Sequence, residues 1–115
     1  GFHSNFLILT GDFNMIPSTK RPLIDIIGSD SIPNERNSRL LENIINSREA
    51  IDIFRAKNGS KKDYTFIGFN TASSQRSRID LSLCNAKTIG SIKSMKHLII
   101  NKSIFDHKAA IIDIS

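Results

Sequence analysis

The sequence predicts an α/β protein in which a mostly antiparallel or mixed sheet is combined with one or two helices. Three observations support this fold class. A short apolar run over residues 6–10 is typical of a strand that is buried on both faces. Residues 39–47 carry apolar side chains at helical spacing, and residues 78–84 alternate between apolar and polar side chains, the period of a half-buried strand.

The first half of the chain is expected to hold one strand, an irregular stretch and one helix. The strand over residues 6–10 ends at the turn Gly11-Asp12-Phe13-Asn14. Residues 23–27 form either a short helix or a loop, and residues 28–37 form a loop. Ser38 is a suitable N-cap for a helix over residues 39–47. The apolar stripe of this helix consists of Leu40, Leu41, Ile44 and Ile45.

The second half of the chain is expected to be dominated by strands. A buried connector containing Ile51, Ile53 and Phe54 leads to a turn at Asn58-Gly59-Ser60. Strands are predicted over residues 64–67, 78–84, 91–100 and 109–114. In the second of these, Ile79, Leu81 and Leu83 share one face, and Arg78, Asp80 and Ser82 share the other.

Composition excludes several classes of protein. The chain has 115 residues, of which 39% are hydrophobic and 23% charged, which is typical of one globular domain or part of one. A single cysteine, Cys84, allows neither an internal disulfide nor a thiolate zinc site, so we expect a buried apolar residue there. No apolar run approaches the length of a membrane span and no signal peptide is recognisable, so an intracellular location and no membrane partner are expected. The net charge of +5 favours a polyanionic partner.

Three polar segments stand at strand ends. Asp12 and Asn14, two residues apart, can reach into one cleft, or they can simply form an Asx-turn. Arg78 and Asp80 lie on the polar face of a strand, where they can serve a site or form an ordinary surface ion pair. His107 can act as acid, base or phosphate ligand, although a lone histidine is more often structural.

Taken together, these segments resemble the endonuclease/exonuclease/phosphatase superfamily. The resemblance rests on a strand followed by GDFN, then SRID within a strand, then Asp106-His107 before a last strand, and it covers residues 6–114. Two further segments, Asp52-Ile53-Phe54-Arg55 and Asp63-Tyr64-Thr65-Phe66, are similar to the endonuclease domains of non-LTR retrotransposons.

The resemblance implies a role for each motif residue. Asp12 would position or activate the attacking water, and Asn14 would contact the scissile phosphate. Asp80 would orient His107, which contacts the phosphate. These four are the candidate catalytic residues, and Asp106 would help to bind Mg²⁺. Candidate phosphate or DNA contacts, besides Asn14 and His107, are the basic residues Arg36, Arg39, Lys57, Lys61, Lys62, Arg76 and Arg78.

The resemblance also implies that residues 1–115 are a single partial domain, the C-terminal half of a four-layer α/β/β/α sandwich. The start at Gly1, almost directly before a strand, indicates a fragment or a processed chain. The glutamate that is the main metal ligand of the family lies upstream of GDFN, so we expect the chain alone to be inactive. Phe105 stands where the family usually has serine. The sheet would expose an apolar face, which the missing N-terminal half or a second copy would cover.

The implied function is that of a magnesium-dependent DNA endonuclease of the retrotransposon type, with the nucleus as its location. One alternative is a phosphatase or lipid phosphodiesterase of the same superfamily. Another is a degenerate remnant with a non-catalytic binding role, which Phe105 and the start of the chain would fit.

Overall fold

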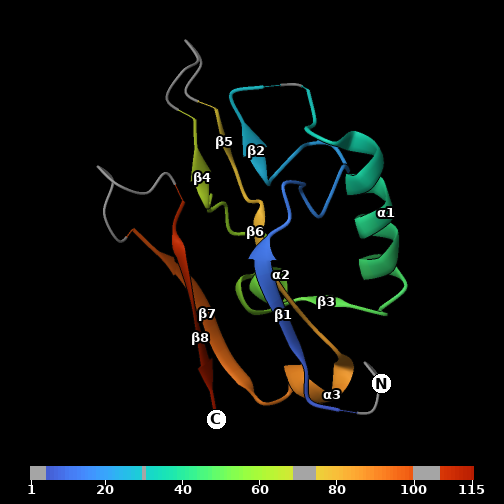
Figure 1. Cartoon of the computed structure of the whole chain (residues 1–115), viewed down its shortest axis with the longest axis vertical. Helices are drawn as coiled ribbons and strands as arrows, with labels where there is room; N and C mark the ends of the chain where they lie inside the picture. The colour runs from blue at the N-terminus through green and yellow to red at the C-terminus, as the bar shows by residue number, and fades with distance from the viewer. Residues whose placement is uncertain (1–4, 30, 69–74, 100–106) are drawn as a thin grey trace.

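The computed structural model describes residues 5–29, 31–68, 75–99 and 107–115. In this part of the chain it shows a mixed α/β domain with three small antiparallel sheets and three helices (Figure 1). The strands are β1 (Ile8–Asp12), β2 (Ile26–Ile27), β3 (Ile51–Asp52), β4 (Phe66–Ile67), β5 (Arg76–Ser77), β6 (Asp80–Cys84), β7 (Ile92–Leu98) and β8 (Ala109–Ile114). The helices are α1 (Glu35–Asn46), α2 (Ile53–Asn58) and α3 (Ala86–Ile89).

Strand β6 is the centre of the first sheet, whose order is β1-β6-β3. The antiparallel register pairs Ile8 with Cys84 at one end and Asp12 with Asp80 at the other. The second sheet has the order β2-β5-β4, and β7 pairs with β8 in the third. Because β5 and β6 are separated only by Arg78 and Ile79, the first two sheets are joined end to end through this short junction.

The main core lies between α2, β6 and β7. Its fully or almost fully buried members are Ile53, Phe54, Cys84, Ile92 and Met95. Cys84 is buried at the end of its strand as predicted, and burial raises the pKa of its thiol to about 11, so the thiol stays protonated at neutral pH.

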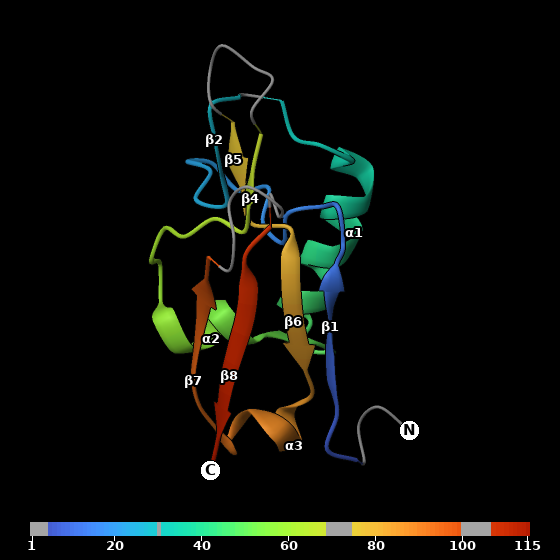
Figure 2. The same ribbon diagram turned by 60° about the vertical axis from the view of Figure 1, so that its left-hand side comes forward.

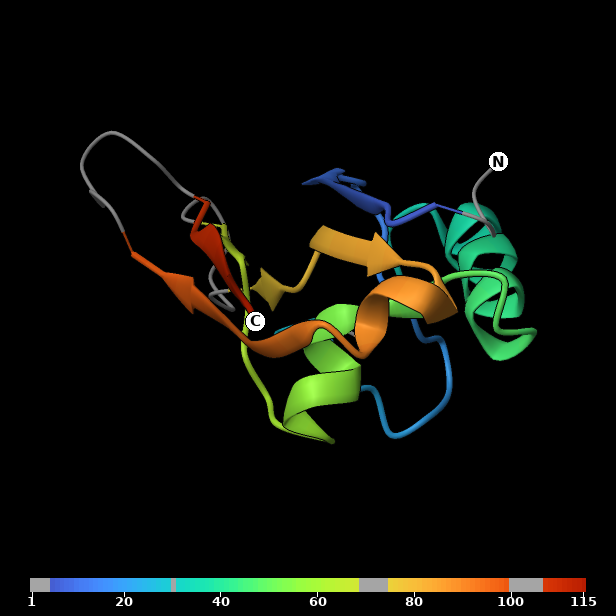
Figure 3. The same ribbon diagram turned by 90° about the horizontal axis from the view of Figure 1, so that it is seen from below.

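Helices cover both faces of β6, but some large apolar side chains of β1 and β8 remain exposed. Helix α2 packs against β6 and β7, and Leu41 of α1 packs with Leu81 and Leu83 on the other face of β6 (Figure 2; Figure 3 gives the view from below). Ile8 and Ile112 pack against the main core, so their strand neighbours Leu9 and Ile111 point the other way. Leu9 is 47% exposed and Ile111 39% exposed.

The first strand departs from its prediction in two respects. It continues through Gly11 and Asp12 instead of turning after Thr10, and it is largely exposed, not buried on both faces. The physical reason is that β1 is an edge strand with one partner, so apolar composition was a poor guide to its burial. Residues 23–27, predicted as helix or loop, contribute the short strand β2.

Helix α1 begins four residues before the predicted start, so Ser38 is not its N-cap. Asn34 occupies that position, and Ser38 is fully buried inside the helix. The Ser38 hydroxyl accepts the amide of Ile16 at 3.1 Å, so tertiary contact explains this serine better than capping does. Only Leu41 and Ile45 of the predicted apolar stripe face the interior, whereas Leu40 and Ile44 are exposed.

The strand-rich second half follows the predictions more closely. Strand β8 has the predicted bounds, β7 lies within the predicted 91–100, and β4 starts two residues later than predicted. Gly59 ends α2 with a φ of 61°, as the predicted turn requires. Helices α2 and α3 were not predicted, because six and four residues are too few to show a helical period. None of the described helices is long and apolar enough to span a membrane.

Candidate functional site

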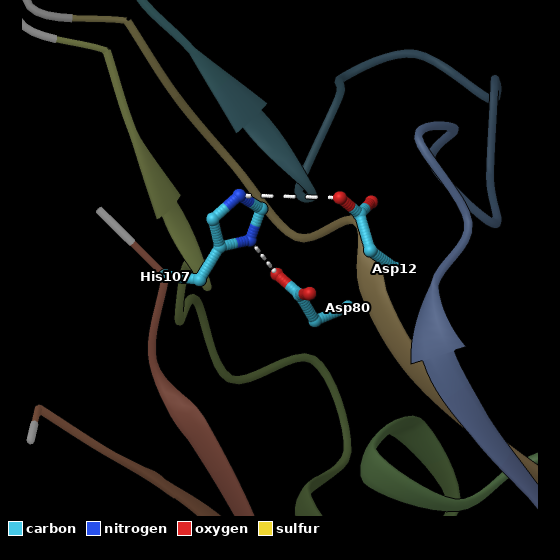
Figure 4. A group of neighbouring side chains, drawn as sticks. All are labelled: Asp12, Asp80 and His107. Atoms are coloured by element: carbon cyan, nitrogen blue, oxygen red, sulfur yellow. Dashed lines mark hydrogen bonds and ion pairs between the residues drawn. The ribbon is translucent and has the colours of Figure 1, made fainter. Parts of the chain in front are cut away.

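Three of the candidate residues come together at one end of the first sheet. Asp12 is the last residue of β1, Asp80 is the first residue of β6, and His107 lies two residues before β8 (Figure 4). The pairing of Asp12 with Asp80 in the strand register places the two carboxylates side by side. The potential ligand atoms of the trio all lie within 4.8 Å of one another.

The His107 ring is held between the two carboxylates. Its Nδ1 lies 2.7 Å from Oδ2 of Asp80, and its Nε2 lies 3.9 Å from Oδ2 of Asp12. An ionised carboxylate can only accept a hydrogen bond, so Nδ1 carries the hydrogen that is donated to Asp80. Nε2 is thereby turned toward Asp12 and solvent. The His107 side chain is 32% exposed and that of Asp12 48% exposed, so a reactant can reach both.

Asp12 also closes an Asx-turn. Its Oδ1 accepts the backbone amide of Asn14 at 2.9 Å, and Asn14 has a positive φ of 50°. The carbonyl of Asn14 in turn accepts Nδ2 of Asn34 at 2.7 Å. The local-turn interpretation and the site interpretation of GDFN therefore hold together, because one carboxylate oxygen closes the turn and the other faces His107. Asn14 itself is exposed and follows Asp12 by two residues in the sequence.

Helix α1 fixes the segment that follows this turn. Glu42 accepts hydrogen bonds from the hydroxyl of Ser18 at 3.0 Å and from the amide and hydroxyl of Thr19 at 2.9 and 2.6 Å. Burial alone would raise the pKa of Glu42, but the bonds from Thr19 and Ser18 outweigh it and lower the pKa. Glu42 therefore stays ionised and anchors the chain just beyond Asp12.

Thr65 connects strand β6, which carries Asp80, to the segment that carries His107. Its hydroxyl oxygen accepts the amides of both Ile79 and Asp80 at 3.0 Å. Its carbonyl accepts the amide of Lys108, the residue after His107, at 2.8 Å. Thr65 is fully buried, so these contacts are shielded from water. In the sequence, Thr65 stands out only as part of the segment Asp63-Tyr64-Thr65-Phe66, because no local pattern reveals such long-range partners.

Phe66 supports the other side of the histidine. It forms a β-bridge with His107, and the two rings lie 5.0 Å apart with a tilt of 52°. His107 is thus positioned by an aromatic contact, a main-chain bridge and the hydrogen bond to Asp80.

Arg78 is not part of this site, and its predicted role in binding phosphate or DNA is wrong. Its side chain has no solvent exposure. Nη1 and Nη2 donate to the two oxygens of Asp52 at 3.0 and 2.6 Å, and Nε donates to Asp25 at 2.9 Å. Burial alone would lower the pKa of Arg78, but Asp52 and Asp25 outweigh it and raise the pKa, so the guanidinium remains charged. The alternative prediction, a surface ion pair of Arg78 with Asp80, is also wrong, because Arg78 is buried and pairs with Asp25 and Asp52.

The remaining predicted positions divide into two groups. Asp106, the predicted magnesium ligand, and Phe105 lie outside the described residues. The other predicted phosphate contacts, all of them exposed, are Arg36, Arg39, Lys57, Lys61, Lys62 and Arg76.

The trio by itself does not fit a magnesium site. Mg²⁺ prefers oxygen ligands in octahedral geometry, whereas one of the three donors here is an imidazole nitrogen. Nδ1 of His107 and an oxygen of Asp80 are also already engaged with each other at 2.7 Å. The arrangement fits a histidine whose tautomer is fixed by one carboxylate and whose other ring nitrogen faces a second carboxylate.

The architecture and the trio define an α/β domain with a solvent-accessible Asp–His–Asp arrangement. The sequence matches no known family model and no curated protein. Any assignment of function therefore rests on the motifs and on the geometry of the trio.

Proposed function

We propose that the chain is the C-terminal half of a DNA endonuclease of the endonuclease/exonuclease/phosphatase superfamily, related to the retrotransposon type. The observation that carries this proposal is the His107 ring held by Asp80 at 2.7 Å with its second nitrogen directed at Asp12. Asp12, Asp80 and His107 come from three motifs that lie far apart in the sequence, and they meet in this one arrangement.

The chemistry that this arrangement supports is hydrolysis of a phosphodiester. Asp12 is placed to accept a proton from a water that attacks phosphorus. His107, with Nδ1–H donated to Asp80, presents Nε2 to a phosphate oxygen, and in its protonated form it stabilises the negative charge that builds up there. Asp80 touches the histidine and not the substrate, so it acts as a positioning residue.

Magnesium belongs to the proposal through the resemblance alone. When bound, it would supply charge neutralisation at the phosphate. The described residues offer no complete ligand set for it, so we assign no step to it. We accordingly propose that the chain alone has no appreciable nuclease activity.

The four-layer sandwich and the partner are part of the same proposal. Leu9 of β1 and Ile111 of β8 are large apolar side chains that remain exposed. We propose that a second sheet, supplied by an N-terminal half or by another copy of the chain, covers exposed apolar side chains of these strands. The exposed basic residues and the net charge of +5 support DNA as the substrate.

Plasmid nicking with a matched variant tests the proposal. The polypeptide extended upstream in the same reading frame should relax supercoiled DNA only with Mg²⁺, and His107→Ala should lower the rate by about 10²–10⁴-fold, the usual contribution of a positioned acid or base. The 115-residue chain alone should not nick DNA.

The outcomes separate the proposed function from its alternatives. Faster turnover of inositol phosphates or sphingomyelin than of DNA would replace the DNA substrate and keep the superfamily. Extended polypeptides that bind DNA equally with and without His107→Ala, and cleave nothing, would mean a degenerate binding remnant. Nicking that is indifferent to His107→Ala would contradict the assigned site.

A further inference from the structure

A second cluster of charged side chains includes the residue that follows His107 in the sequence. It consists of Asp63, in the loop before β4, His97 in β7, and Lys108, the residue that follows His107. Lys108 Nζ lies 3.0 Å from Oδ1 of Asp63, and Nδ1 of His97 lies 3.2 Å from Oδ2. The carboxylate of Asp63 therefore joins three segments that are distant in the sequence.

The cluster is attached to the rigid core of the molecule. The His97 side chain has no solvent exposure and stacks on Phe54, with ring centroids 4.6 Å apart and an interplanar angle of 22°. Phe54 is itself fully buried in the main core. Asp63 also accepts the amide of Tyr64 at 3.0 Å, so its carboxylate has few ways to move.

Lys108 is tied to this structure at both ends. Its amide donates to the carbonyl of Thr65 at 2.8 Å, and its Nζ reaches Asp63. Both partners lie in the same short segment before β4. Because residue 108 is bonded to this segment through main chain and side chain, the orientation of the peptide that leads back to His107 is restricted.

We propose that Asp63 and Lys108 are positioning residues that hold the His107 imidazole against Asp80, with His97 fixing Asp63 from the core. The catalytic meaning of this inference rests on the proposed function, but the positioning itself can be measured without any activity. The competing interpretation is an ordinary, partly exposed ion pair, which contributes little to structure. The side chains of Lys108 and Asp63 are each 20% exposed, so screening by water is incomplete.

The test observes the His107–Asp80 hydrogen bond directly. Nitrogen-15 NMR of the histidine rings in the whole chain, at a fixed pH where His107 is neutral, reports which ring nitrogen carries hydrogen. Wild-type His107 should show the Nδ1–H form that Asp80 requires. Lys108→Met should lose this preference, and the exchange of the His107 ring proton should rise by about ten- to a hundredfold, as expected for one lost charge-assisted hydrogen bond.

Two variants serve as controls, one for the loss of net charge and one for the return of a cation beside Asp63. Lys96→Met removes the same charge from an exposed position on β7 and should leave the His107 signal unchanged. Lys108→Arg keeps a cation within reach of Asp63 and should restore the wild-type signal. If Lys108→Met does not fold, Asp63→Asn decides, because it removes the charge from the other partner and keeps its size.

A wild-type His107 signal in folded Lys108→Met, or in folded Asp63→Asn, would overturn the inference. Equal changes in Lys96→Met would also overturn it, because the effect would then come from net charge. Failure of the extended polypeptide to cleave DNA, combined with a His107 signal that depends on Lys108, would reject the proposed function and leave the positioning intact.

Discussion

Arg78 shows how one side chain can follow its sequence motif and still have a different role. The SRID motif suggested a strand face on which Arg78 and Asp80 act together. In the structure the regular strand begins only at Asp80, and Arg78 turns inward to bridge Asp25 and Asp52. Its guanidinium also lies 5.1 Å from the centre of the Phe54 ring. The residue therefore stabilises the core beneath the site.

Replacement of Arg78 by alanine should cost about 3–5 kcal/mol of the free energy of unfolding. The loss is large because Asp52 stays behind at 5% exposure without its counter-charge, and Asp25, at 1% exposure, keeps only Arg55. Urea unfolding followed by circular dichroism measures it. Arg76→Ala, two residues earlier and exposed, should change stability by less than about 0.5 kcal/mol. A cost below about 1 kcal/mol for Arg78→Ala would mean that the buried bridge contributes little.

The residues of the trio could be predicted from the sequence, and the residues that support them could not. Asp12, Asp80 and His107 stand in short motifs whose residue types point to chemistry. Thr65 and Lys108 carry no such signal, because their importance comes from partners that are remote in the sequence. Burial of Arg78 was missed since an arginine on an alternating strand looks solvated until its buried partners are known.

At the scale of elements, the junction between β5 and β6 determines the geometry of the site. Two amides, those of Ile79 and Asp80, would be left without a strand partner at this junction, and the Thr65 hydroxyl oxygen accepts both. The same residue accepts the main chain of Lys108. One threonine thus connects the start of β6 to the segment before β8.

Thr65→Val should therefore destabilise the protein by about 1–3 kcal/mol, because the isosteric side chain leaves buried amides without an acceptor. Thr65→Ser keeps the oxygen and should be milder. Thermal unfolding compares the two variants, and the amide NMR signals of Ile79 and Asp80 should move in Thr65→Val only. Greater destabilisation by Thr65→Ser than by Thr65→Val would show that the methyl group, and not the hydroxyl, is what matters.

The long strands were easier to predict than the short helices and the two-residue strands β2, β3 and β5, and the reason is length. Strand β8 and most of β7 show clear β-forming runs, so their bounds agree well with the prediction. Helices α2 and α3 each begin at an aspartate or asparagine whose side chain accepts an amide of the first turn, a signal that is visible only once the helix is suspected. The start of α1 was misplaced because Ser38 imitates a cap while serving a tertiary contact.

For the whole molecule, a buried histidine makes stability depend on pH. Burial lowers the pKa of His97, and the bond to Asp63 only partly offsets this effect. Arg78 and Lys108 disfavour a further positive charge there as well. For Asp63, burial alone would raise the pKa, but Lys108 and His97 outweigh it and lower the pKa. The cluster is thus arranged for a neutral histidine beside an ionised aspartate.

The free energy of unfolding should fall as the pH drops below about 6.5, the ordinary pKa of histidine. Below that value the unfolded chain binds a proton at residue 97 that the folded chain does not, until the lower folded pKa is reached. Asp63 adds a second loss of stability at more acidic pH, below the usual pKa of aspartate. Urea unfolding at several pH values measures both. His97→Gln should flatten the first step, and an unchanged step would assign it to another histidine.

The pairing of β1 with β6 also governs how the protein reaches its native state. The contact between Thr10 and Ser82 closes a loop with a sequence separation of 72 residues, and such distant pairings form slowly because chain entropy must be lost first. The adjacent strands of the β7–β8 pair face no comparable separation. During synthesis, β1 must wait for β6 to be made, with Leu9 accessible throughout. We therefore expect Asp12 to be placed late in folding, because the trio is complete only once β1 has paired with β6.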